Sequence, residues 1–146
     1  MTMKKILILF FAMAMLQIVA NGQAKKKPVA KIKAPTKCGF FMDGKMANKV
    51  TAEQMIAWCD QEKLYVMCDN GKKYLLKSFE ISVIQKEPYA MKDFGIGEGG
   101  MPIMARREIK NIKEGDSLFL KNLLGLDDNM LEVKLPVLVV GVYNQK

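Results

Sequence analysis

Gly95, Gly97 and Gly100 have the spacing G-x-G-x-x-G, the pattern in this chain with the most specific chemical meaning. In dinucleotide-binding folds, glycines at this spacing let a strand turn tightly into a helix whose first backbone amides hold a pyrophosphate. Here Met101 and Pro102 follow at once, and the surrounding segments do not alternate between strand and helix as that fold requires. We therefore predict that residues 95–100 bind no nucleotide and form a flexible loop, in which glycine permits unusual backbone angles.

The residue types that usually carry catalysis are sparse. The chain has no histidine, which removes Ser-His and Cys-His catalysis, imidazole metal ligands and the commonest general base. The neighbouring acids Asp127 and Asp128 fall in a predicted turn, where turn chemistry accounts for them. We expect a protein that is not an enzyme and needs no cofactor or metal, with a hydrolase built from two distant carboxylates as an open alternative.

The three cysteines, Cys38, Cys59 and Cys68, contain no C-x-x-C pair, so a zinc site is not expected. Cys59 lies on the apolar face of a predicted helix and Cys68 on the apolar face of the following strand. Both positions suit small buried hydrophobic residues with free thiols. An oxidising compartment would equally allow a disulfide between Cys59 and Cys68, and both interpretations stay open.

The segment from Phe94 to Arg107 combines glycines with large apolar residues that no strand pattern assigns to the core. Methionine adapts its shape to a facing surface, and arginine can bind carboxylates at a rim. If the domain binds a protein partner, we expect this segment to make the contact; the alternative is that it closes one end of the core. The candidate contact residues are Phe94, Ile96, Met101, Ile103, Met104, Arg106 and Arg107.

A mostly β domain must position these residues. Thr51 and Gln54 have the spacing of a capping box, and apolar residues recur at helical spacing up to Cys59, which predicts a helix of about ten residues. A second, short helix is predicted over residues 104–112. Alternating or continuous apolar runs predict strands at residues 38–42, 63–68, 74–86, 117–124, 130–135 and 135–143.

The strand patterns also predict which side chains are buried. In residues 74–86, Phe79, Ile81 and Val83 are expected to face the core and Ser82 to face water. The last strand, LPVLVVGVY, is a continuous apolar run that predicts burial on both faces. Short turns between successive strands favour antiparallel pairing, in a sandwich or a strongly curved sheet.

The first 24 residues have the organisation of a secretory signal peptide. Two lysines precede an apolar run over residues 6–16, and small residues suit cleavage after Ala24. A permanent membrane anchor is the alternative, but Gln17 interrupts the run before the roughly 20 residues that a spanning helix needs. We expect an exported protein that is not an integral membrane protein after cleavage, most simply periplasmic, with the cell surface or extracellular space as alternatives.

The formal charge of +8 comes from the N-terminal part of the chain. Eight of the 23 basic residues precede Cys38, and the 15 that remain equal the 15 acidic residues, all of which follow Cys38. Residues 25–37 hold six lysines and no acid, the composition of a disordered linker. Adhesion of this linker to anionic lipid or polysaccharide stays open, whereas the balanced folded part, residues 38–146, predicts no nucleic-acid binding.

Two motifs and their order resemble the C-terminal domain of GldM, the gliding-motility and type IX secretion motor protein. A capped helix comes first, two motifs follow it, and an apolar strand ends the similarity, which covers residues 39–143. The first motif is a Ser-Phe-x-Ile-Ser strand, and the second joins a helix to a strand through a Gly-Asp turn. The matching residues are Ser78, Phe79, Ile81 and Ser82, then Ile112, Lys113, Gly115 and Asp116.

The resemblance implies an immunoglobulin-like β-sandwich with one or two short helices, which acts through protein contacts. GldM has a membrane helix and several periplasmic domains, whereas this sequence predicts a signal peptide and one domain. We therefore expect a free-standing relative that binds another envelope or secretion-system protein, linked to type IX secretion or gliding. A soluble periplasmic protein that binds a small apolar or glycan ligand is the second expectation.

Overall fold

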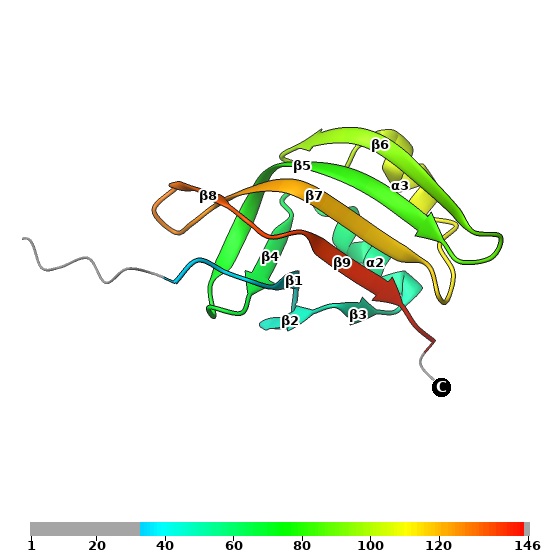
Figure 1. Ribbon diagram of the computed structural model, residues 1–146, viewed down its shortest axis with the longest axis horizontal. Helices are drawn as coiled ribbons and strands as arrows, with labels where there is room; N and C mark the ends of the chain where they lie inside the picture. The colour runs from blue at the N-terminus through cyan, green and yellow to red at the C-terminus, as the bar shows by residue number, and fades with distance from the viewer. Residues whose placement is uncertain (1–32, 145–146) are drawn as a thin grey trace, which may run out of the picture. The chain divides into compact units, whose positions relative to one another are not determined.

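The computed structural model describes residues 33–144, so the predicted signal peptide lies outside the described residues. The described part is mostly β, with two short helices, as predicted (Figure 1). The helices are α2 (Ala52–Cys59) and α3 (Ile103–Ile109). The strands are β1 (Cys38–Met42), β2 (Lys45–Ala47), β3 (Lys49–Val50), β4 (Tyr65–Cys68), β5 (Lys73–Gln85), β6 (Ala90–Glu98), β7 (Ser117–Leu126), β8 (Glu132–Lys134) and β9 (Leu138–Val142).

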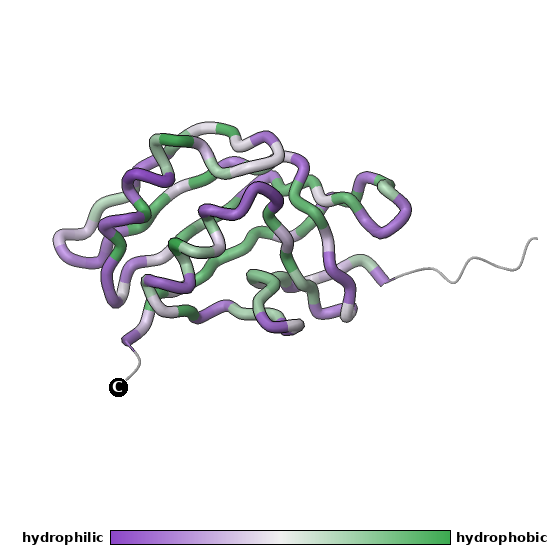
Figure 2. Tube along the Cα trace, turned by 180° about the vertical axis from the view of Figure 1, so that it is seen from behind, coloured by the Kyte–Doolittle hydropathy of each residue, from purple (hydrophilic) through white to green (hydrophobic). Residues whose placement is uncertain are grey.

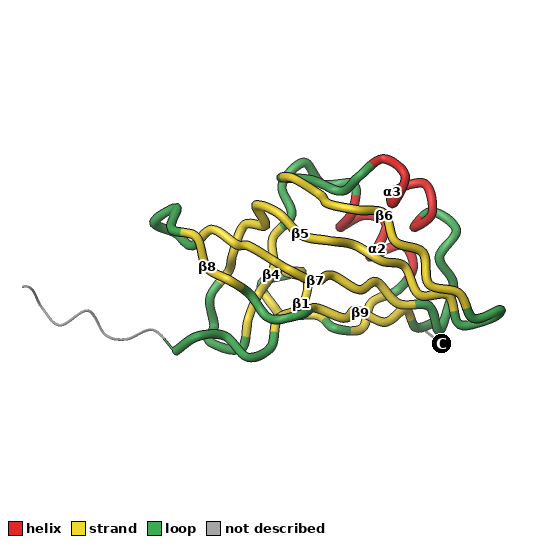
Figure 3. The backbone as a smooth tube through the Cα atoms, turned by 45° about the horizontal axis from the view of Figure 1, so that its top comes forward, coloured by secondary structure: helices red, strands yellow, loops and turns green. Residues whose placement is uncertain are grey.

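One sheet curves into a nearly closed barrel (Figure 3). Its strand order is β2-β1-β4-β5-β7-β9-β3, and β2 and β3 are separated only by Asn48. β2 pairs antiparallel with β1, whereas β3 pairs parallel with β9, so this short segment connects the two ends of the sheet. Closure leaves few unpaired strand edges, which protects a β protein from pairing with other chains.

β5 changes its partner along one edge. Leu75 pairs with Tyr65 of β4, whereas Ser78 pairs with Glu98 of β6. The other edge of β5 pairs with β7 over almost its whole length. β6, β5, β7 and β9 therefore lie side by side as four antiparallel strands, visible across the front of the molecule (Figure 1).

The helices and the inward faces of the strands form the core. Trp58 of α2 is fully buried, its ring stacks on Phe40 of β1 with the centroids 3.8 Å apart, and its indole N–H donates to the Tyr65 carbonyl at 3.0 Å. The predicted capping box is confirmed, because Thr51 and Gln54 each bond the other's backbone N–H. Hydrophobic stretches follow the strands, and hydrophilic ones gather in the connecting loops (Figure 2).

Residues 90–98 form β6, so the predicted flexible loop is wrong for this part of the glycine segment. Gly97 lies opposite Phe79, and a Cβ at Gly97 would lie 2.5 Å from the Phe79 ring. Gly95 has a φ of 76°, next to the point where the register shifts between Glu80 and Ser82. The two glycines therefore serve a strand, one through close packing and the other through a positive φ.

β9 is buried on one face only, which corrects the prediction for the last strand. Its inward residues, Leu138 and Val140, are fully buried, but Val139 between them is 46% exposed. The barrel interior covers the inward face, whereas Val139 points outward beside Phe119 of β7. A continuous apolar run therefore does not mean burial on both faces here.

Ser82, predicted to face water, is buried at 1% exposure. It points outward from β5, where Phe119 of β7 and Asp93 of β6 lie directly opposite it on either side. Its hydroxyl donates to the Asp93 carboxylate. The predicted place of Phe79, Ile81 and Val83 in the core is confirmed, since each is 1% exposed and belongs to the buried hydrophobic cluster.

A disulfide joins Cys38 of β1 to Cys68 of β4, which are directly opposite in the antiparallel register. The predicted Cys59–Cys68 pair is therefore wrong. Cys59 lies on α2 as a buried free thiol, which was the other interpretation. Burial raises the pKa of this thiol well above its ordinary range. The thiol of Cys59 consequently stays protonated and unreactive.

The folded domain begins before Cys38. The Asp69 carboxylate accepts bonds from the backbone N–H of Thr36, at 3.0 Å, and from its hydroxyl, while the Asp69 N–H donates to the Lys37 carbonyl. The Thr36 hydroxyl above all holds the pKa of the Asp69 carboxyl below its usual value. Thr36 and Lys37, predicted as the end of a linker, are thus attached to the domain.

Within residues 33–144, no helix has the length and apolar character to cross a membrane.

Candidate protein-contact surfaces

The structure divides the predicted contact segment among different environments. Met101 is buried at 4% exposure, and Phe94 packs against the core, so these two side chains belong to the core. Ile96 is 65% exposed on β6, and Ile103 and Met104 are 70% and 60% exposed at the start of α3. Only part of the segment can therefore meet a partner.

The exposed residues of the segment lie on two sides of the sheet. Ile96 pairs with Glu80 and shares its outward direction. α3 packs on the inward side, because its Glu108 accepts a bond at 2.6 Å from Lys92, the residue opposite the inward-facing Val83. The single surface that the sequence predicted is thus two separate ones.

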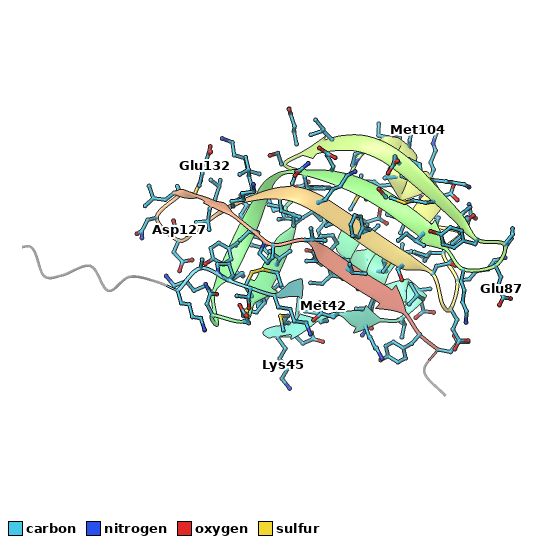
Figure 4. All side chains as sticks on the ribbon, in the orientation of Figure 1. Met42, Lys45, Glu87, Met104, Asp127 and Glu132 are labelled. Atoms are coloured by element: carbon cyan, nitrogen blue, oxygen red, sulfur yellow. A yellow bond between two sulfur atoms is a disulfide. The ribbon has the colours of Figure 1, made fainter. Side chains whose placement is uncertain are left out.

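The outward face of α3 is the first candidate, and we call Ile103, Met104, Arg107 and Lys110 the helix surface. All four residues are exposed, and their spacing of three or four places them on one side of the helix. Met104 projects outward beside α3 (Figure 4). The apolar residues begin this surface and the two cations end it, so a fitting partner offers apolar side chains flanked by carboxylates.

Arg106 has a different role from its neighbour Arg107. It is half-buried, and its Nε donates to the Met101 carbonyl at 3.1 Å. The guanidinium therefore stabilises the turn that leads from β6 into α3. This bond gives Arg106 a structural role, and its part in partner contact stays a prediction.

The two methionines of the predicted segment give a first test. We expect Met101→Ala to lower the free energy of unfolding by about 2–5 kcal/mol, because it opens a cavity in the core. Met104→Ala should change it by less than about 0.5 kcal/mol, since the side chain is exposed. Urea denaturation followed by circular dichroism measures both; equal losses would contradict the assignment of the two residues.

The second candidate lies on the outward side of the four adjacent strands. Met91 of β6 lies beside Ile84 of β5, and Phe119 of β7 beside Val139 of β9. Met91 and Val139 are each 46% exposed, while Ile84 and Phe119 are half-buried. We call these four residues, together with Ile96, the sheet face.

Charged residues on this side of the sheet lie among the apolar ones, because Glu80 of β5 pairs with Ile96 on one side and with Lys121 of β7 on the other. The Glu80 carboxylate accepts a bond from Asn122 at 2.7 Å and lies 3.4 Å from the Lys121 ammonium; the Asn122 bond first, and Lys121 second, hold its pKa below the usual value. Asp93 on β6 and Lys49 on β3 are both exposed, at opposite borders. The sheet face therefore has an acidic and a basic border.

An apolar groove of about 650 Å³ opens near the point where β5 changes partner. Leu75, Leu76 and Leu126 line it, and Lys63 and Glu98 stand among the charged residues of its lining. Concave sites with apolar walls and a few polar groups are typical of small-molecule binding. The groove is the feature that fits the expected small apolar ligand.

Two carboxylates with defined partners hold loops in place. Asp127 accepts two backbone N–H bonds inside its own turn, each of 2.9 Å, and Asp116 accepts two more from the loops that it joins, also of 2.9 Å. Across the described residues, no three side chains of the metal-binding types gather into a group that could hold an ion. These carboxylates therefore give the hydrolase alternative no support.

The glycine segment lacks the geometry of a phosphate site. β6 runs antiparallel to β5, and the helix that follows, α3, has Pro102 as its N-cap without a side-chain capping bond. In the dinucleotide fold, by contrast, the strand belongs to a parallel sheet and the first helical amides face the phosphates. That no nucleotide binds there stays a prediction, and the strand geometry supports it.

Five residues of these surfaces were not singled out from the sequence: Ile84, Met91, Lys110, Phe119 and Val139. Lys110 continues the exposed face of α3 one turn after Arg107, so helical spacing alone would have found it. Phe119 and Val139 point outward from β7 and β9, and their exposure depends on which strands lie beside them. The continuous apolar run of the last strand was the signal for Val139, interpreted as burial.

No family model matches this chain, and a comparison of its whole sequence with curated proteins finds no match. The geometry of the surfaces, with the resemblance of the motifs, is therefore the basis for assigning a function.

Proposed function

We propose that this protein is a non-enzymatic interaction module of the cell envelope, which binds another envelope or secretion-system protein. The helix surface carries the proposal, because Ile103 and Met104 are 70% and 60% exposed next to Arg107 and Lys110. Apolar patches rimmed by charge are typical of protein-contact sites. The two cations select a partner whose own apolar patch carries acidic residues at its border.

The likeness to the GldM C-terminal domain supports the same function. The second of the two motifs that carry this likeness forms the turn between α3 and β7. Gly115 there has a φ of 89°, and the Asp116 carboxylate accepts hydrogen bonds from the backbone N–H groups of Lys86 and Lys113. This motif therefore has a structural role, which a free-standing domain and a domain of a larger machine can share while binding different partners. Membership of that family, its immunoglobulin-like sandwich, and a link to type IX secretion or gliding are parts of the proposal.

Export is also part of the proposal, to the periplasm first and to the cell surface or extracellular space as alternatives. The Cys38–Cys68 disulfide supports export, because disulfides persist in oxidising compartments and are rare in reducing ones. The predicted signal peptide points the same way.

Charge reversal on the helix surface tests the proposed function. Crosslinking and capture from envelope extract should recover a partner with the wild-type protein, and Arg107→Glu/Lys110→Glu should weaken that capture at least about tenfold, since like charges then face each other. Lys45→Glu/Lys134→Glu is the matched control: both lysines are exposed and lie outside α3, Lys45 on β2 (Figure 4). Both double variants should melt within a few degrees of the wild type.

Capture that survives charge reversal on the helix surface would contradict the proposal. If such a variant is in addition stabilised against heat by an aliphatic ligand, the groove beside Leu75 and Leu126 becomes the functional site. The protein would then be the small-ligand binder, the second candidate function.

A further inference from the structure

Lysines gather at the end of the barrel where β4 turns into β5. The Lys33 carbonyl accepts a bond from the Asn70 side chain, and the Lys37 carbonyl accepts one from the Asp69 backbone N–H at 2.9 Å. These bonds hold the residues before β1 against the turn that leads into β5. We call the lysines of the two stretches the lysine pole; three are exposed and one is half-buried: Lys33, Lys37, Lys73 and Lys72.

The positive charge of the lysine pole has little compensation. Asp69 is the single acid in residues 33–37 and 67–73, and both of its carboxylate oxygens accept bonds from Thr36. Four lysines and this one carboxylate give a formal charge of +3. The ion pairs found within residues 33–144 involve other lysines, namely Lys77, Lys92 and Lys121. The ammonium groups of the pole are therefore available to an anionic partner.

We propose that the lysine pole binds the surface of an anionic membrane, to which the protein adheres without spanning it. Every basic residue of the pole is a lysine, whose ammonium group acts as a compact point charge. Recognition of one carboxylate or phosphate group typically uses the two-pronged bonds of arginine instead. Lysines spread over one end of a domain suit an extended surface that carries many negative charges.

The sequence before the pole favours lipid over an anionic polysaccharide. Residues 25–32 add four lysines and no acid, and Val29 and Ile32 lie among the lysines. At the boundary between head groups and acyl chains, apolar side chains are buried while ammonium groups contact lipid phosphates. A polysaccharide offers no acyl layer, so it gives these apolar residues nothing to enter.

Adhesion through the lysine pole leaves the helix surface accessible. The chain enters the described domain at one end of the barrel, and α3 lies at the other (Figures 1 and 3). A molecule held on a membrane can therefore still bind the partner of the proposed function. The inference goes beyond that function and does not depend on it.

Co-sedimentation of the full chain, as processed by the cell, with lipid vesicles tests the proposal. We expect binding to phosphatidylcholine vesicles that contain about one third phosphatidylglycerol, and none to phosphatidylcholine alone. Lys37→Glu/Lys72→Glu should weaken binding at least about tenfold, because each lysine near an anionic surface contributes about fivefold in affinity. Raising the salt from about 0.1 M to about 1 M should release the protein, since charges are then screened beyond about 3 Å.

Lys63→Glu/Lys110→Glu is the matched control, because it changes the net charge equally at two exposed lysines outside the pole. It should leave vesicle binding within about twofold of the wild type. Circular dichroism confirms that each variant folds; if Lys72→Glu disturbs its turn, Lys33→Glu/Lys37→Glu takes the place of the first double variant.

Three outcomes would overturn the proposal. They are equal binding to vesicles without phosphatidylglycerol, binding that survives reversal of the lysine pole, and binding to dextran sulfate but to no anionic vesicle. The last outcome would make a polysaccharide the partner. Vesicle binding and capture of a protein partner are separate measurements, so a failure of the lysine pole is distinguishable from a failure of the helix surface.

Discussion

Replacing Trp58 by alanine is expected to lower the free energy of unfolding by about 3–5 kcal/mol, the range for removing a large aromatic side chain from a core. Trp58 is fully buried, stacks on Phe40 with 3.8 Å between centroids, and donates its indole N–H to the Tyr65 carbonyl. The substitution therefore opens a cavity between α2 and β1 and leaves a carbonyl without its donor.

The measurement is urea denaturation followed by far-UV circular dichroism. Fluorescence is unsuitable because Trp58 is the single tryptophan of the chain. Trp58→Phe is the matched control: it keeps an aromatic ring against Phe40 but loses the hydrogen bond, so we expect a smaller loss of about 1–2 kcal/mol. A loss below about 1 kcal/mol for Trp58→Ala would show that α2 does not anchor the barrel as described.

Local patterns predicted the parts of the fold that depend on near neighbours in sequence. The helix after Thr51 is an example, because its capping box with Gln54 and its apolar spacing are complete within a few residues. The inward direction of Phe79 follows in the same way from alternation along one strand. Such features need no knowledge of what lies beside them.

The parts that were missed depend on pairing between distant segments. β6 contains glycines that a strand normally disfavours, and its Gly97 is explained only by the Phe79 ring opposite. Cys38 was not recognised as a disulfide partner because nothing in the sequence places β1 beside β4. Closure of the barrel by the two short strands on either side of Asn48 is equally invisible in local patterns.

The candidate surfaces show the same division. The sequence made Met101 and Ile103 candidate contact residues alike, but Ile103 is exposed and Met101 is buried. Met101 precedes α3 and enters the core, whereas Ile103 begins the outward face of that helix. The sheet face required still more: Phe119 and Val139 became part of one surface only when β7 and β9 were known to be neighbours.

Removing the Cys38–Cys68 disulfide is the second change with a large expected effect. The bridge closes a loop with a sequence separation of 30, and the chain-entropy model gives a loss of about 3–4 kcal/mol for a loop of this length. Cys38→Ser/Cys68→Ser is the informative variant, because a single substitution would leave Cys68 or Cys38 free to pair incorrectly with Cys59.

Cys59→Ala is the matched control, since it removes a buried thiol that has no covalent partner. It should cost less than about 2 kcal/mol, as expected for a small change in a core. In this variant, a reducing agent should then lower the urea midpoint to nearly that of the double serine variant, because the same bridge is lost.

The hydrogen bonds that join Thr36 and Lys37 to Asp69 remain when the disulfide is removed, and they keep β1 near β4 in the folded state. The stability therefore falls mainly through the unfolded chain, which gains the freedom that the bridge had removed, and the barrel itself should keep its circular dichroism spectrum. A midpoint that reduction does not change would contradict a native Cys38–Cys68 bridge, and with it the support that the disulfide gives to export.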